Sequence, residues 1–203
     1  MSVAQAPAVI AGAHDADADF APRGAVERRA DYTTLRRPEM FIVPLLAAAI
    51  ASGIERHCPA RSGARVLDAG CGRQPFRTLL EKRGATYVGF DAAPQEGVVL
   101  DHLGALDQPL PATLRAGGGF DFILCTEVLE HIADWTAAFA NLASLLAPGG
   151  RLLLTAPAYY ILHEEPHDFF RPMLHAFAFY AQRHALRIVE ARQLGDAWDL
   201  LGT

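Results

Sequence analysis

The stretch that decides the fold is VLDAGCGRQPF, residues 66–76. It begins as an apolar run, passes through Gly70 and Gly72, and continues into a segment with helical character. A strand that ends in glycines before a helix brings main-chain N–H groups close to a ligand, because glycine has no Cβ. A nicotinamide-binding loop would have a third glycine at position 75, where this chain has Pro75. The stretch therefore predicts a ligand loop, but it argues against the pyrophosphate of a dinucleotide.

Three acidic residues stand at the ends of predicted strands. Asp68, two residues before Gly70, suits a ligand that carries a positive amino group. Asp91 ends the next strand, where a carboxylate can accept hydrogen bonds from ribose hydroxyls. Asp101 ends a third strand and is placed to accept a hydrogen bond from an adenine amino group. A ligand with an amino acid head, a ribose, an adenine and no phosphate is S-adenosylmethionine. The plain alternative is a helix-initiating acid beside an ordinary glycine turn.

Outward from this stretch, strand-like and helix-like segments alternate. The alternation predicts an α/β fold, a doubly wound, Rossmann-like and mostly parallel sheet with helices on both faces. After the sixth predicted strand only GDAWDLLGT remains, which leaves little room for a seventh. The predicted strands cover 64–70, 86–91, 97–103, 120–127, 151–158 and 186–194, and the predicted helices cover 31–57, 75–84, 134–150 and 171–185.

Composition limits the organisation of the chain and its partners. With 203 residues, a hydrophobic content of 51% and a net charge of −5, the chain fits a single folded domain and shows no basic surface for nucleic acid or an anionic membrane. Three cysteines without a CxxC pair indicate reduced thiols in a cytoplasmic protein. We expect a disordered segment over residues 1–30, a helical segment and candidate lid over 31–57, and the ligand-binding domain over 58–203.

A second group of functional candidates lies in CTEVLEHI, residues 125–132, after the fourth predicted strand. If a helix begins there, Glu127, Glu130 and His131 share one face. Two carboxylates and an imidazole on one face can bind a divalent metal or supply a general base. The alternative is that the glutamates stabilise a helix N-terminus and His131 packs at the cofactor rim.

The polar and aromatic stretch YYILHEEPHDFFRP, residues 159–172, predicts a substrate-facing loop. Among its side chains, His163 and His167 are functional candidates. Phe169 and Phe170 are expected in the core, with Arg171 paired to a nearby acid.

In these segments the chain resembles the class I S-adenosylmethionine-dependent methyltransferases. The resemblance rests on VLDAGCG, YVGFD, FDFILCTEVLEHIADW and LAPGGRLLLTAP, which stand in the order of that family's motifs. It is closest to a bacterial subgroup that reads DxGCGxxPF and later HEEPxDFFR, often found among glycan or natural-product genes.

The resemblance implies a set of cofactor-binding residues, namely Asp68, Gly70, Cys71, Gly72, Asp91, Asp101 and Thr126. Some family members use similar Glu-x-x-Glu-His segments to bind metal, which makes Glu127, Glu130, His131 and His167 the candidate ligands of a divalent ion. Other members carry the segment without metal, so this choice stays open.

The expected reaction is O-methylation of a small hydroxylated molecule, such as a metabolite, sugar or natural product. A hydroxyl acceptor must lose a proton, and His131, His167 and Glu127 are the candidate catalytic residues. N- or C-methylation on the same scaffold and a non-catalytic S-adenosylmethionine-binding regulatory module are the alternatives. Binding of NAD is a third, which Asp68 and Pro75 disfavour.

Overall fold

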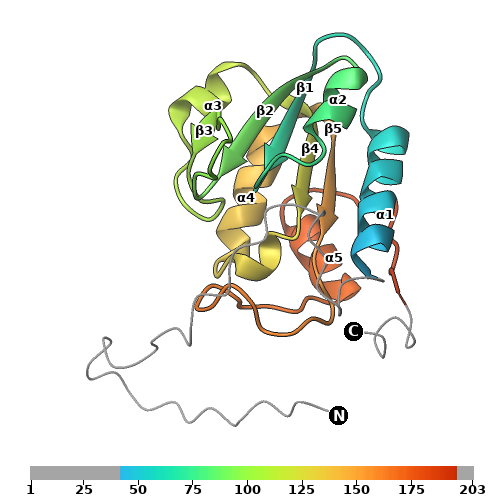
Figure 1. Cartoon of the computed structure of the whole chain (residues 1–203), viewed down its shortest axis with the longest axis vertical. Coiled ribbons are helices and arrows are strands. Elements are labelled where there is room, and N and C mark those ends of the chain that lie inside the picture. The colour runs from blue at the N-terminus through green and yellow to red at the C-terminus, as the bar shows by residue number, and fades with distance from the viewer. Residues whose placement is uncertain (1–41, 196–203) are drawn as a thin grey trace.

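A central sheet of parallel strands, ordered β3-β2-β1-β4-β5, organises the computed structural model, which describes residues 42–195. Helices cover both of its faces (Figure 1). The strands are β1 Ala64–Ala69, β2 Ala85–Asp91, β3 His102–Leu103, β4 Phe120–Thr126 and β5 Leu146–Thr155. The helices are α1 Ile42–His57, α2 Arg77–Lys82, α3 Ala112–Ala116, α4 Trp135–Leu145 and α5 Leu174–Arg183, and a 3-10 turn spans Leu129–His131.

The strands are apolar on both sides because each face of the sheet packs against helices. In β1, Val66 packs with α1 and α2, whereas Leu67 packs on the other face with α3 and α4. In β4, Phe122 and Ile123 separate in the same way. The predicted doubly wound architecture is therefore confirmed.

Helix α1 is one of the layers that cover the sheet. Ile50 and Ile54 of α1 are buried against β1 and β4, and Gly53 allows α1 to approach Leu153 of β5. Within 42–57 the segment thus contributes to the core, and its role as a lid stays a prediction. The expectations for residues 1–30 and 31–41 lie outside the described residues.

Several predicted boundaries move in the structure. The strand predicted over 97–103 is reduced to two residues, and α3 forms where no helix was predicted. The last strand begins at Leu146, because Phe120 already pairs with Leu146 before the register shifts to Phe122 and Arg151.

The sixth predicted strand is wrong. Residues 186–194 carry no regular secondary structure, so β5 is the edge strand of the sheet within residues 42–195. The Glu190 carboxylate explains the difference, because Arg56 and His57 of α1 both bond it and tie this segment to the helix. The apolar residues Leu186, Ile188 and Val189 would suit a strand only if β5 offered the partner.

Cys58, Cys71 and Cys125 are free and buried. Over residues 42–195, no helix is long and apolar enough to cross a membrane.

Candidate active site

The glycine loop after β1 is held by main-chain hydrogen bonds. Gly70 adopts a φ of 77° and donates its N–H to the Phe90 carbonyl of β2 at 2.7 Å. A Cβ at Gly70 would lie 2.2 Å from Cγ2 of Val128, in the segment that follows β4. Only glycine permits this approach, so the loop after β1 and the segment after β4 meet at this position.

Asp91, at the end of β2, anchors the same loop. One of its carboxylate oxygens accepts the Gly72 N–H at 2.8 Å, and the other accepts the Ala93 N–H at 3.1 Å. Its side chain is buried, and these bonds fix the carboxylate beside the glycines. Each oxygen has a second lone pair, so the carboxylate can still accept a hydrogen bond from a ligand hydroxyl.

Asp68 is buried at the carboxyl end of β1 and accepts a hydrogen bond from the Tyr87 hydroxyl at 2.8 Å. Burial raises the pKa of Asp68 to about 7, and the nearby Asp91 charge adds to this, while the Tyr87 bond opposes it. A cationic group beside Asp68 would stabilise its charged form. The residues here therefore fit the ammonium group and ribose of S-adenosylmethionine.

The other expected cofactor residues differ in their positions. Cys71 is buried within the loop, its N–H 3.2 Å from the Phe90 carbonyl, and Thr126 ends β4 opposite Thr155. Asp101 was expected to end the third strand, but it precedes β3 instead. Its carboxylate accepts the Gly89 N–H at 2.7 Å and so holds β3 against β2.

Glu127 comes directly after β4 with a φ of 54°, so no helix begins there. Its carboxylate accepts the Thr155 hydroxyl at 2.8 Å. Burial raises the pKa of Glu127 to about 7, partly offset by the Thr155 bond. The expected helix face with Glu130 and His131 does not form, because the 3-10 turn starts only at Leu129.

Glu130 is fully buried in that turn, and neither of its carboxylate oxygens has a hydrogen-bond partner among the described residues. Burial, with the nearby charge of Glu127, raises the pKa of Glu130 well above its ordinary value. A buried carboxyl without a partner is protonated or awaits a ligand.

The ring of His131 is oriented by a hydrogen bond from its Nδ1 to a main-chain carbonyl. Its Nδ1 lies 2.7 Å from the His167 carbonyl, which can only accept, so Nδ1 carries the hydrogen. In the neutral ring the lone pair is therefore on Nε2, which lies 3.7 Å from Glu130 and 3.9 Å from Glu164. Burial lowers the pKa of His131, which favours this neutral form.

Sequence reasoning placed the wrong histidine of the loop beside His131. The His163 ring packs edge-on against His131 with ring centroids 4.8 Å apart, whereas His167 contributes its carbonyl and its ring is exposed. Asp168 orients His163. One of its carboxylate oxygens lies 3.2 Å from His163 Nδ1 and accepts the main-chain N–H of His163 at 2.9 Å.

Arg171 holds the loop in this shape. It donates to Asp168 and to the carbonyls of Tyr160 and Ile161. Although burial alone would raise the pKa of Asp168, its bonds from Arg171 and from the His163 N–H keep that pKa below its ordinary value. The expected pairing of Arg171 with an acid is confirmed. The Asp-x-x-Arg spacing was the available signal, but it could not show which histidine the pair would support.

One potential metal-binding group lies among the described residues. Ligand atoms of Glu130, His131 and His163 lie within 4.8 Å of one another. The predicted set differed, since Glu127 bonds Thr155 and the His167 ring stands outside the group. The unpartnered Glu130 oxygens and two imidazoles form a donor set that a divalent cation could use.

The two phenylalanines of the loop are not core residues, contrary to expectation. Phe169 and Phe170 are 44% and 42% exposed, and their N–H groups both point to the Glu130 carbonyl, at 2.8 and 3.2 Å. This pairing of main chains lays the loop over the 3-10 turn, and Phe170 also packs against the Trp135 ring.

The sequence pattern of the methyltransferase-domain family matches residues 45–202, which includes the whole sheet and the loop after β5. The chain belongs to the class I S-adenosylmethionine-dependent methyltransferases. The predicted family is thereby confirmed, and with it the expected cofactor.

Curated relatives of this methyltransferase include the ubiquinone biosynthesis O-methyltransferases of Xanthomonas axonopodis pv. citri and Xanthomonas campestris pv. campestris. Each is 37% identical, over 105 and 106 residues, or 46% and 47% of this chain. The matches cover only 43% and 44% of the relatives' own lengths, so the chain spans less than half of each.

Among solved structures, phosphoethanolamine N-methyltransferase 2 of Haemonchus contortus, in complex with S-adenosyl-L-methionine, has a TM-score of 0.51 and 19% identity. The match covers 67% of this chain and 36% of that one. The [4+2]-cyclase SpnF has a TM-score of 0.55 and 17% identity, covering 71% of this chain and 58% of that one. These similarities show the fold alone.

Proposed function

We propose that this chain transfers a methyl group from S-adenosylmethionine to a hydroxyl of a small molecule, with His131 as the proton acceptor. The observation that carries the proposal is the bond from His131 Nδ1 to the His167 carbonyl. It leaves the basic nitrogen Nε2 available in the 3-10 turn after β4, three residues after Val128, which approaches Gly70. The names of the curated relatives, which are O-methyltransferases, support the hydroxyl acceptor.

S-adenosylmethionine, when bound, supplies a methyl carbon activated by positively charged sulfur. Asp68 and Asp91 would hold the amino and ribose ends of the cofactor, and the chain would mainly provide orientation. As the hydroxyl oxygen bonded to the methyl carbon, the carbon–sulfur bond would break, S-adenosylhomocysteine would leave, and the hydroxyl proton would pass to His131 Nε2. A neutral imidazole is required for this, and burial favours that form.

The loop after β5 would complete the acceptor side. Asp168 and Arg171 keep His163 against His131, and Phe169 and Phe170 offer exposed aromatic surface beside the 3-10 turn. Aromatic and aliphatic groups around few polar groups are typical of small-molecule sites. We therefore place the acceptor between this loop and the glycine loop.

A divalent ion at Glu130, His131 and His163 is a second candidate role for the same side chains, favoured by the unpartnered Glu130 carboxylate. These residues would hold the ion, which would lower the pKa of a bound acceptor hydroxyl. His131 would then be a ligand and not the base, so the two roles exclude each other.

Replacement of His131 by alanine tests the proton-acceptor role. Turnover should fall by about 10²- to 10⁴-fold because the transfer loses its general base, while S-adenosylmethionine affinity should stay unchanged. Methyl transfer and calorimetric cofactor titration would be measured with the same panel of hydroxylated acceptors. His175→Ala, an exposed histidine on α5, is the matched control. A fully active His131→Ala variant would remove His131 from the mechanism.

Direct Mn²⁺ titration of the metal-free chain tests the metal role independently of activity. Saturable binding that Glu130→Gln abolishes would support a metal site, because the amide loses the anionic ligand. Absence of binding, with activity that survives a chelator, would exclude it. If the chain binds S-adenosylmethionine but transfers no methyl group to hydroxyl, amine or carbon acceptors, a regulatory binding module is the better description.

A further inference from the structure

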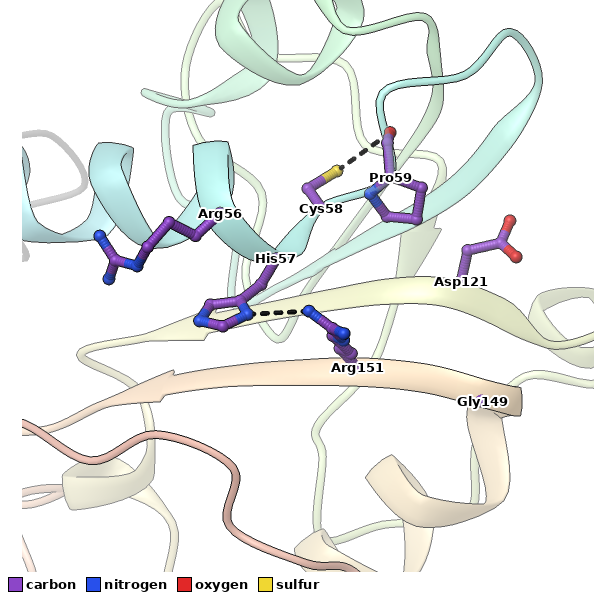
Figure 2. A pocket seen from close by; sticks show the side chains of 7 residues that line it. All are labelled: Arg56, His57, Cys58, Pro59, Asp121, Gly149 and Arg151. Carbon is purple, nitrogen blue, oxygen red and sulfur yellow. Dashed lines mark hydrogen bonds between the residues drawn. The ribbon is translucent and has the colours of Figure 1, made fainter.

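A separate cavity opens at the other end of the sheet, away from the glycine loop. It has a volume of about 340 Å³ and lies between the end of α1 and the starts of β4 and β5. Figure 2 shows its lining, with the Arg151 side chain rising from β5 toward the His57 ring. The volume is at the small end of the range for ligand pockets. The lining residues are Arg56, His57, Cys58, Pro59, Asp121, Gly149 and Arg151.

Arg151 is the cationic group of this cavity without a carboxylate partner. Within the described part of the chain, no acidic oxygen lies within salt-bridge distance of its guanidinium. Among the described residues, its NH1 donates to His57 Nδ1 at 2.9 Å. A guanidinium has five N–H donors, so most of those of Arg151 are available to a ligand.

A chain of hydrogen bonds fixes the direction of Arg151. Because the guanidinium can only donate, His57 Nδ1 must accept, and the ring hydrogen is then on Nε2. Nε2 lies 2.6 Å from Glu190, whose pKa is held at about 2 mainly by this bond and by Arg56. Glu190 is therefore charged at neutral pH and keeps His57 in the orientation that supports Arg151.

The other charges around the cavity are already compensated. Asp121 accepts from Arg61 at 2.7 Å and from the Arg65 N–H at 2.8 Å. Arg56 points away from the His57–Arg151 pair in Figure 2 and bonds Glu190. With these pairs balanced, the net charge of the cavity comes from Arg151.

Two features remove obstacles to an anion. The carbonyls at the end of α1 would repel one, but Arg83 donates to those of Glu55 and Cys58, at 3.0 and 2.9 Å. At Gly149, an added Cβ would meet nothing within 4 Å, so this wall leaves open space beside Arg151.

We propose that this cavity binds a small oxyanion, a phosphate or carboxylate group of a metabolite, through the guanidinium of Arg151. The planar guanidinium fork matches both groups with two parallel hydrogen bonds. The site is distinct from the methyl-transfer site, because it lies at the amino ends of β4 and β5 while the glycine loop and His131 lie at the carboxyl ends.

Calorimetric titration of the full chain with inorganic phosphate and, separately, succinate tests the proposal. The wild-type chain should bind at least one of them saturably, and Arg151→Ala should weaken that binding by about tenfold or more. Arg151→Lys keeps the charge but loses the fork, so its affinity should lie between the two. Arg115→Ala, at an exposed arginine of α3, is the matched control, and thermal unfolding would show that each variant is folded.

Tighter binding of phosphate would assign a phosphorylated ligand, and tighter binding of succinate a dicarboxylate. The proposal fails if the wild-type chain binds neither probe at concentrations of about 10 mM. It also fails if folded Arg151→Ala binds as tightly as Arg115→Ala.

Discussion

The two halves of the carboxyl edge of the sheet differ in how their buried acidic side chains are hydrogen-bonded. On the side of β1 and β2, the buried acids are satisfied: Asp91 accepts two main-chain N–H groups and Asp68 accepts the Tyr87 hydroxyl. On the side of β4 and β5, Glu130 is buried without a partner, and His131 presents an unprotonated nitrogen nearby.

We connect this difference with the two tasks proposed above, cofactor binding in the half at β1 and β2 and proton transfer in the half at β4 and β5. A site that must bind the same cofactor in every cycle gains from groups that are fixed before the ligand arrives. A site that moves a proton needs a group that can accept one at neutral pH, and the unprotonated Nε2 of a neutral His131 ring is such a group. The two halves meet at Gly70 and Val128, so their independence can be tested there.

The largest expected effect is that of Gly70→Ala, because its new methyl group would push the loop after β1 away from the segment after β4. The new Cβ would lie 2.2 Å from Val128, and the φ of 77° adds strain, so the free energy of unfolding should fall by about 2–4 kcal/mol. Urea denaturation measures this change. Gly63→Ala, with a φ of 75° and open space around it, should lose only about 1 kcal/mol. Equal losses would mean that the contact with Val128 is unimportant.

The next effect is a pH dependence of stability. The cofactor should alter the contribution of Asp68 to it but not that of Glu127. The folded-state pKa values of Asp68 and Glu127 are raised to about 7, so between about pH 4 and pH 7 the unfolded chain releases protons that the folded chain retains. Stability should therefore fall as the pH rises through this range, and Asp68→Asn should remove part of the slope.

Unfolding at several pH values, with and without S-adenosylmethionine, separates the two acids. A cationic ligand stabilises charged Asp68, so the cofactor should reduce the fall in the wild-type chain and in Glu127→Gln, but less in Asp68→Asn. A cofactor effect of equal size in all three chains would contradict the assignment of Asp68.

The smallest effect concerns the cofactor half alone. Asp91→Ala removes the acceptor of the Gly72 and Ala93 N–H groups, and S-adenosylmethionine affinity should fall by roughly tenfold. Calorimetric titration measures it, with Glu55→Ala on the exposed side of α1 as the control. An unchanged affinity in Asp91→Ala would refute the assignment of Asp91 to the ribose.

The cofactor half could be predicted from sequence because its chemistry is local. Asp68, Gly70 and Asp91 lie at the ends of adjacent strands, and apolar runs between glycines identify those strands directly. The same local reasoning failed over residues 186–194, where the apolar and β-branched residues suit a strand. The ion pairs of Glu190 with α1 decide that segment, and a local pattern cannot show them.

The reactive half was predicted by residue type but not by arrangement. Glu130 and His131 were correctly grouped, whereas a helical face was assumed for Glu127, whose backbone turns the other way. His163 and His167 are equivalent in sequence, four residues apart in one loop. Their separation depends on Asp168 and Arg171, which only the folded loop brings together.

The left-handed backbone of Glu127 has an evolutionary consequence. A glycine would adopt its φ of 54° without the steric strain that a side chain imposes, and that strain costs about 1 kcal/mol. Selection for thermal resistance alone should therefore favour glycine at this position and discard the carboxylate. A lineage that retains the acid there accepts a less stable backbone, so laboratory evolution under heat, without a demand for activity, would reveal whether function kept Glu127.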